Sequence, residues 1–235
     1  MTNSPGSDFN PRWSPDGQQI VFVSTRDGDR DIYLMQADGS NVRNLSNNRA
    51  EDDAPNWSPD GELIVFSSDR DGNREIYLMR TDGTSVKRLT HELAYDIYPA
   101  FSPDGARIAF ISNRTRDAEL YLMDVNGDAV FQLTEDFEDV KYPSWHPSGE
   151  EIIFASDQSG NWELYRINLL GDPPENLTTN LAHDASPDYS PDGRLVAFDS
   201  NRLGNYEIYY LELATLAVTR LTNNVEFDGD PDWVP

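Results

Sequence analysis

Short apolar runs separated by turn residues follow one another along the whole chain. Residues 63–67 read Leu-Ile-Val-Phe-Ser, residues 75–79 read Glu-Ile-Tyr-Leu-Met, and an Asp-Gly pair lies between these runs and again after the second. Runs of β-branched and aromatic residues bounded by Gly, Pro, Asn and Asp are typical of short strands joined by tight turns. The pattern therefore predicts antiparallel strands, and no window has the spacing of an amphipathic helix.

This strand pattern repeats with a period of 44 residues. An aromatic residue followed by Ser-Pro-Asp-Gly, or by His-Pro-Ser-Gly in the fourth copy, stands at Trp13, Trp57, Phe101, Trp145 and Tyr189. Each unit contains four predicted strands, which matches the length and content of one blade of a β-propeller. We therefore expect an all-β fold, a β-propeller of four-stranded antiparallel blades.

The repeats define a single propeller domain, residues 1–235, and set the expected number of blades. The five complete repeats are predicted at about residues 8–51, 52–95, 96–139, 140–183 and 184–227. Residues 228–235 hold an extra first strand, because Asp8–Trp13 and Asp228–Trp233 both read Asp-x-x-Pro-x-Trp. Five blades are favoured over six, closed by one of the two copies in a monomer. The alternative is an oligomer, since an unpaired strand edge can pair with a neighbouring chain.

Composition narrows the classes of partner. The chain has 18 Lys and Arg against 42 Asp and Glu, a formal net charge of −24. Such an acidic protein is repelled by phosphate backbones and anionic lipids, so we expect neither nucleic acid binding nor membrane insertion. Cysteine is absent, which excludes disulfides and thiolate chemistry.

The repeated motifs resemble those of the TolB-like β-propellers, relatives of the WD-type propellers. The resemblance rests on the aromatic-Ser-Pro-Asp-Gly turn, the Arg-Asp-Gly-Asn-x-Glu-Ile-Tyr-x-Met hairpin and the Asp-Gly…Leu-Thr ending, and it covers residues 8–235. It implies a non-enzymatic propeller in the periplasm that binds a protein or peptide partner. Members of the family typically carry six blades.

Candidate binding residues come from positions that precede each predicted first strand. The innermost strands of a propeller line its channel, so one residue from each blade should meet at the channel rim. At the start of each predicted first strand except that of the fourth repeat stands an aspartate, and the residue directly before this position differs from repeat to repeat. The predicted rim consists of Glu51, Asp52, Tyr95, Asp96, Asp139, His183, Asp184, Phe227 and Asp228. The alternative for the recurring acids is that each caps its own loop. The alternative for the varied position is that it lies in an exposed loop whose sequence is unconstrained.

Arginine and acid also recur on either side of one hairpin turn. The pairs are Arg26 with Asp31, Arg70 with Glu75, Arg114 with Glu119, and Arg202 with Glu207. We expect each guanidinium to meet its carboxylate across the turn and to stabilise the blade.

Catalysis has little support in the sequence, so we predict no catalytic residue, no metal and no cofactor. The histidines His91, His146 and His183 stand at different repeat positions, and the Gly-x-Ser-x-Gly nucleophile motif does not occur. Two alternatives to a binding module stay open. One is an amplified or engineered repeat scaffold without a dedicated ligand. The other is a channel-based hydrolase or lyase that uses carboxylates or a divalent cation.

Overall fold

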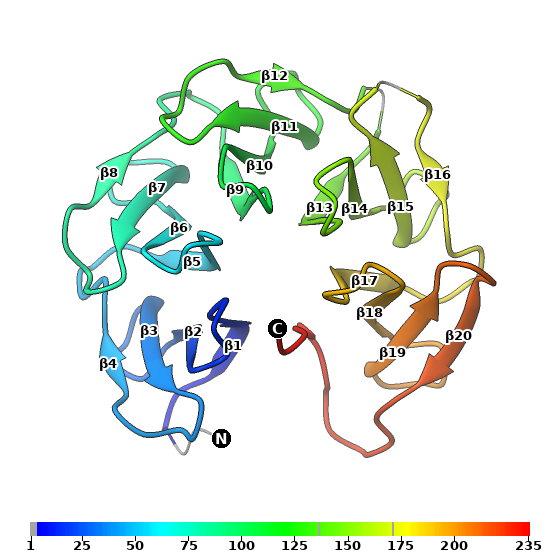
Figure 1. Cartoon of the computed structure of the whole chain (residues 1–235), viewed down its shortest axis with the longest axis horizontal. Coiled ribbons are helices and arrows are strands. Elements are labelled where there is room, and N and C mark those ends of the chain that lie inside the picture. Colours follow the sequence, from blue (N-terminus) through cyan, green and yellow to red (C-terminus); the bar gives the residue numbers. More distant parts are fainter. Residues whose placement is uncertain (1–3, 136, 171) are drawn as a thin grey trace.

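The computed structural model describes residues 4–135, 137–170 and 172–235, which form five four-stranded antiparallel sheets arranged as blades around a channel (Figure 1). Blade one contains β1 (Asp8–Trp13), β2 (Gln19–Ser24), β3 (Asp31–Gln36) and β4 (Arg43–Asn44). Blade two contains β5 (Asp52–Trp57), β6 (Leu63–Ser68), β7 (Glu75–Arg80) and β8 (Lys87–Arg88). Blade three contains β9 (Asp96–Phe101), β10 (Arg107–Ser112), β11 (Glu119–Asp124) and β12 (Phe131–Gln132).

Blade four contains β13 (Val140–Trp145), β14 (Glu151–Ser156), β15 (Glu163–Asn168) and β16 (Glu175–Asn176). Blade five contains β17 (Asp184–Tyr189), β18 (Leu195–Ser200), β19 (Glu207–Glu212) and β20 (Ala217–Arg220). The predicted all-β propeller with five four-stranded blades is confirmed. The described residues contain no helix, so none of them forms a helical membrane span.

Every first strand is bulged at the same place. The pairing of β1 with β2 shifts register between Phe9 and Arg12, and the equivalent shift occurs in the other four blades. The residue at the bulge has a positive φ in each copy, and this holds for Asn10, Ala54, Tyr98, Tyr142, Ser186 and, in the C-terminal segment, Asp230. A bulge re-aims side chains, and here it turns one residue of each copy toward the channel.

The core lies between blades. Val21, Val23, Ile32 and Leu34 of blade one pack in one cluster with Ile64, Phe66, Tyr77 and Met79 of blade two. Equivalent clusters join blades two and three, three and four, and four and five. Blades two to four therefore each bury one face against the blade before and the other against the blade after, as in repeat folds whose stability depends on neighbouring repeats.

The C-terminal segment, residues 228–235, closes the ring in a way that the sequence did not predict. It forms no strand, and it runs back to the channel between blades five and one (Figure 1). β1 keeps its place beside β2, while no contact joins β1 directly to β17. Of the two copies of the first-strand pattern, the N-terminal one forms β1 of blade one, and the C-terminal one forms no strand but lies beside it.

Candidate functional site

The central channel opens beside the Ser-Pro-Asp-Gly turns into a cavity of about 270 Å³. Its floor contains the residue that precedes the repeated aromatic in each copy of the first strand. We call these residues the channel mouth: Arg12, Asn56, Ala100, Ser144, Asp188 and Asp232. Tryptophans and prolines of the turns, including Trp57, Pro59 and Pro147, form the surrounding wall. One residue from each of six positions thus faces the same space, although only five positions belong to complete blades.

Side chains of the channel mouth also hold neighbouring copies together. The Phe101 amide donates to Asn56 Oδ1 at 2.9 Å, and the Tyr189 amide donates to Ser144 Oγ at 3.4 Å. The same bond links the C-terminal segment to both neighbours: Trp233 N donates to Asp188 Oδ2 at 3.2 Å, and Trp13 N donates to Asp232 Oδ2 at 2.6 Å. The segment therefore occupies a sixth position in the inner ring.

One arginine faces three acids at this site. Arg12 Nη1 lies 3.5 Å from Asp232 Oδ1. Burial acts to lower the pKa of Arg12, but the charges of Asp232, Asp188 and Asp230 outweigh it and raise that pKa. Burial raises the pKa of Asp232 to about 7 and also raises the pKa of Asp188. The channel mouth thus holds one guanidinium, that of Arg12, beside the two carboxylates of Asp188 and Asp232.

The channel narrows below its mouth. The rings of Tyr98 and Tyr142 pack with their centroids 4.5 Å apart, and only about 30 Å³ of free space remains at this level. Burial raises the pKa of both phenols, so they stay neutral. Asp230 accepts Ser186 Oγ at 3.2 Å and the Asn10 amide at 3.4 Å. This space suffices for about one water molecule, so the channel is nearly closed at this level.

Three of the four recurring acids of the predicted rim form ion pairs within their own blades. Asp52, Asp96 and Asp184 are fully buried. Their carboxylates accept from Arg70, Arg114 and Arg202 respectively, each at 2.9 Å. Each guanidinium also lies over two aromatic rings of its blade, as Arg70 does over Phe66 and Tyr77. These acids therefore anchor the first strand to the hairpin.

The expected pairing of these arginines with the acids across the hairpin turn is wrong. Glu75 instead accepts Thr90 Oγ1 and Arg88 Nη2, both at 2.6 Å, and Glu207 is held in the same way by Thr222 and Arg220. The long side chain of the arginine, such as Arg70, extends over the sheet to the acid of the first strand. The acid after the turn, such as Glu75, is bonded instead by residues in and just after the fourth strand.

The remaining predicted rim residues lie around the opposite end of the channel. Glu51 pairs with Arg30 at 3.4 Å, and Asp228 accepts Asn224 Nδ2 at 2.6 Å. Phe227 is 68% exposed and contacts the ring of Tyr206. Their neighbours Tyr95, Asp139 and His183 bond through their backbone amides to the loop that follows the second strand. Ligand binding at this rim stays a prediction.

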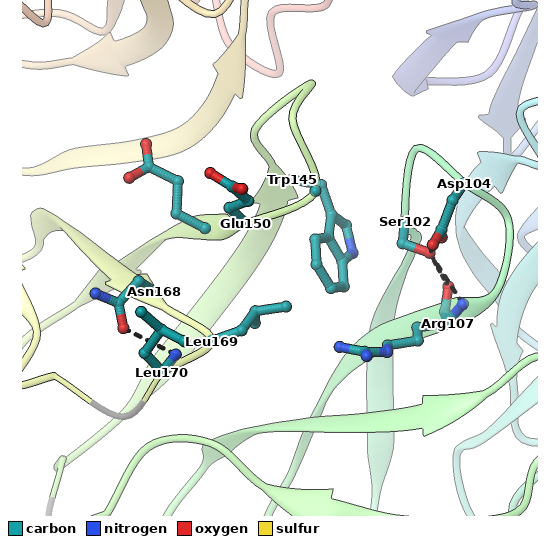
Figure 2. A pocket seen from close by; sticks show the side chains of 10 residues that line it. Ser102, Asp104, Arg107, Trp145, Glu150, Asn168, Leu169 and Leu170 are labelled. Carbon is teal, nitrogen blue, oxygen red and sulfur yellow. Dashed lines mark hydrogen bonds between the residues drawn. The ribbon is translucent and has the colours of Figure 1, made fainter.

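A larger pocket of about 420 Å³ lies between blades three and four (Figure 2). Trp145 forms its central wall, with Arg107 on one side and Leu169 and Leu170 on the other (Figure 2). Leu170 is 90% exposed. The hairpin that carries the two leucines reads Thr-Asp at the equivalent positions of blade two and Leu-Ala at those of blade five.

Sequence reasoning missed the channel mouth. Its residues stand directly before the repeated aromatic and vary from Arg and Asn to Ala, Ser and Asp, while their neighbours repeat. A position that varies between repeats, among neighbours that repeat, could have indicated these residues. The prediction instead used the varied position at the start of the first strand. Alternation of side chains along a strand would have indicated which positions face the channel.

Asp199 leads to a prediction on pH dependence. It lies in β18, is 5% exposed, and its Oδ1 has no hydrogen-bond partner in the part of the chain that the structure describes. Burial raises its pKa to about 6. Since the folded state then binds a proton more tightly than the unfolded state, stability should fall as pH rises from about 4 to about 7, by roughly 2–3 kcal/mol.

The variant Asp199→Ala, which copies Ala155 of blade four, should remove most of this fall in stability. Urea denaturation of both proteins between pH 4 and pH 8 checks the expectation. Equal pH dependence in the two proteins would show that Asp199 titrates normally. Asp232 acts in the same direction up to about pH 7, so the variant keeps a pH dependence of its own, and the contribution of Asp199 is the difference between the two proteins.

Comparison with known proteins agrees with this architecture. Residues 1–139 and 93–182 match the sequence model of the TolB beta propeller domain. A stretch of 45 residues is 40% identical to the Tol-Pal system protein TolB of Syntrophus aciditrophicus (strain SB), covering 19% of this chain and 10% of that protein. The chain therefore spans only a small part of that relative.

Solved structures show the same fold. TolB from Acinetobacter baumannii gives a TM-score of 0.90 at 24% identity, over 100% of this chain and 59% of that chain. Putative TolB from Agrobacterium tumefaciens gives 0.81 at 24% identity, over 92% and 81%. An oligogalacturonate lyase in complex with manganese gives 0.66 at 16% identity, over 89% and 63%. Because the family model covers more than half of the sequence, the chain belongs to the TolB β-propeller domain family.

Proposed function

We propose that this protein is a non-enzymatic module that binds a basic protein or peptide segment at the channel mouth. The observation that carries the proposal is convergence: six inner-ring positions each contribute one residue to a single cavity, and three of the neighbouring side chains are acids facing one arginine. A net charge of −24 favours a cationic partner and speeds its approach.

The geometry suits the insertion of one lysine or arginine side chain. Asp188 and Asp232 are held in place by the backbone amides of Trp233 and Trp13, and their carboxylates have further acceptor capacity. The tryptophan and proline wall can contact the apolar stem of the entering side chain. The tyrosine pair beneath stops the side chain at the level of the acids. Carboxylates held at the floor of an apolar cavity can therefore bind the charged end of a lysine or arginine side chain.

Family membership supports a protein as the partner. One relative is named as the TolB protein of the Tol-Pal system. On the ground of this likeness we propose a protein partner and a location in the periplasm.

A selection experiment tests this function. Random 12-residue peptides displayed on phage are selected on the immobilised protein, and the enriched peptides are synthesised and titrated by fluorescence polarisation. We expect enrichment of lysine or arginine, and binding that weakens as salt rises. Ala100→Lys, which puts a cation into the mouth, should weaken binding at least tenfold.

Ala106→Lys is the matched control, because Ala106 lies in an exposed turn. It should leave the affinity unchanged. Circular dichroism of both variants verifies that the blades are intact. Peptides without basic enrichment, or peptides that bind the Ala100→Lys variant as tightly as the original protein, would contradict the proposal.

A further inference from the structure

The pocket between blades three and four (Figure 2) is a space of its own beside the channel mouth. It shares Ser102 and Trp145 with the wall of the channel mouth, but Arg107, Glu150 and Leu170 line only this pocket. Its volume of about 420 Å³ lies in the range of pockets that bind small ligands or a few residues of a peptide. The proposed function does not use it.

Arg107 provides a guanidinium that is free to bind an anion. Its exposed side chain points into the pocket (Figure 2) and forms no ion pair or side-chain hydrogen bond with any residue that the structure describes. The nearby Asp104 carboxylate already accepts Ser102 Oγ at 2.6 Å and the Ala106 amide at 3.0 Å. The bond from Ser102 lowers the pKa of Asp104, and the charge of Arg107 adds to this effect. A guanidinium with free donors can bind a carboxylate through two parallel hydrogen bonds.

Apolar side chains lie beside this guanidinium. Trp145 Nε1 donates to Ala100 O at 3.1 Å, which fixes the orientation of the indole ring in the pocket wall. Leu169 packs against the core cluster of blades three and four, whereas Leu170 is 90% exposed. Asn168 Oδ1 accepts the Leu170 amide at 3.0 Å and thereby holds the hairpin. An exposed leucine held at the edge of a pocket can cover an apolar group that enters it.

The cation and the exposed leucine both depart from the repeat, and they come from different blades. At the repeat position of Arg107 the other blades have Gln19, Leu63, Glu151 and Leu195. At the repeat position of Leu170 they have Asp38, Asp82, Asn126 and Ala214. The equivalent groove between blades one and two thus has Gln19 beside Trp57. A feature that the fold needs would recur at other junctions, as the Ser-Pro-Asp-Gly turn does, but these two residues meet only between blades three and four.

Glu150 adds a hydrogen-bond acceptor at another edge of the pocket (Figure 2). Its side chain is exposed, and its backbone carbonyl accepts the Leu169 amide at 3.1 Å, which ties this edge to the hairpin. The neighbouring Glu151 is already engaged, because its Oε1 accepts Tyr189 Oη at 2.9 Å. The pocket therefore offers a guanidinium, an apolar wall and a free carboxylate, which can bind a carboxylate, an apolar side chain and a backbone N–H respectively.

We propose that this pocket binds the carboxyl terminus of a polypeptide whose last residue is apolar. The terminal carboxylate pairs with Arg107, the last side chain packs between Trp145 and Leu170, and Glu150 accepts a backbone N–H of the same peptide. The site is separate from the channel mouth, because it binds an anionic group and the channel mouth is proposed to bind a cationic one.

Two synthetic peptides test this proposal. Acetyl-Gly-Ser-Gly-Phe with a free carboxylate, and the same peptide with a carboxyl-terminal amide, are titrated into the nitrogen-15-labelled protein and followed by nuclear magnetic resonance. We expect the carboxylate peptide to cause saturable shifts of the Trp145 indole N–H and the Leu170 amide, and the amide peptide to bind at least tenfold more weakly. Neither peptide contains lysine or arginine, so the result is independent of the function proposed for the channel mouth. Equal affinities, or no shifts at these two groups, would overturn the proposal. So would free phenylalanine that binds as tightly as the carboxylate peptide, because the ligand would then be an amino acid.

Variants of exposed residues identify the groups that bind the peptide. Arg107→Gln should lower the affinity for the carboxylate peptide to that for the amide peptide. Arg194→Gln is the matched control, because it removes a cation from the corresponding turn of blade five, where the side chain is 83% exposed and lies 3.8 Å from Asp192. It should leave both affinities unchanged. Leu170→Asp, which copies blades one and two, should weaken both peptides at least fivefold. The dispersion of the amide resonances verifies that each variant is folded. An Arg107→Gln protein that still prefers the carboxylate peptide would contradict the assignment.

Discussion

Replacing Arg114 by glutamine should lower the free energy of unfolding by about 3 kcal/mol. Arg114 Nη2 lies 2.9 Å from the carboxylate of Asp96, which is fully buried. Removal of the cation leaves that carboxylate without its charge partner, and it also removes the contacts of the guanidinium with the rings of Phe110 and Tyr121. Urea denaturation at neutral pH measures the loss.

Blade four supplies the matched control, because it has Val140 and Gln158 where blade three has Asp96 and Arg114. The double variant Asp96→Val, Arg114→Gln gives blade three the blade-four pair. Since no charge is then buried alone, the double variant should lose about 1 kcal/mol or less. A double variant as unstable as Arg114→Gln alone would show that the ion pair is not the source of the loss.

Deleting residues 228–235 should destabilise the protein by about 3–5 kcal/mol. The deletion removes a half-buried tryptophan, worth roughly 2 kcal/mol of burial, and it leaves the Trp13 amide without its acceptor, which costs about 1–3 kcal/mol. It also removes Asp232 from Arg12. Thermal and urea denaturation give the change.

Deleting only Val234 and Pro235 is the control for this truncation. Both residues are exposed, and Val234 is 57% accessible. The short deletion should change stability by no more than about 0.5 kcal/mol. If the two deletions have the same effect, residues 228–233 do not close the ring. If the longer deletion is neutral, the C-terminal segment is dispensable.

The blades could be predicted from the sequence because their determinants are local and repeated five times. The second strand of each repeat is a run such as Leu63–Phe66, and the turns have Asp-Gly at fixed places. Such signals depend on neighbours in the chain, and a 44-residue period leaves little choice of architecture. Strand pairing within a blade follows from the short hairpins.

Ring closure could not be predicted in the same way. Asp8–Trp13 and Asp228–Trp233 share one pattern, and pattern alone predicts that both form the same strand. The difference lies in partners far away in sequence: β1 has β2 beside it, whereas Asp232 and Asp230 reach the amides of Trp13 and Asn10. Hydrogen bonds between side chains and amides more than 200 residues apart produce no repeating pattern in the sequence, so they could not be predicted from it.

The candidate site shows the same limit. A recurring acid such as Asp96 was predicted to face a ligand, yet its repetition reflects a structural bond to Arg114. The residues that do face the cavity, such as Arg12 and Asp188, vary from repeat to repeat and were hidden among varied neighbours. Which end of the first strand opens into a cavity depends on the packing of the turns, and this is a tertiary property.

Amide hydrogen exchange at Trp13 and Trp233 tests the closure of the ring most directly. Both amides donate to carboxylates of the inner ring, as the amides of Phe101 and Tyr189 donate to Asn56 and Ser144. Nuclear magnetic resonance can follow all four amides in one sample, and hydrogen-bonded amides in a folded unit exchange slowly. The structure predicts protection of Trp13 and Trp233 comparable to that of Phe101 and Tyr189. Exchange of Trp13 and Trp233 at the rate of an unfolded chain, with Phe101 and Tyr189 still protected, would contradict a sixth position in the ring.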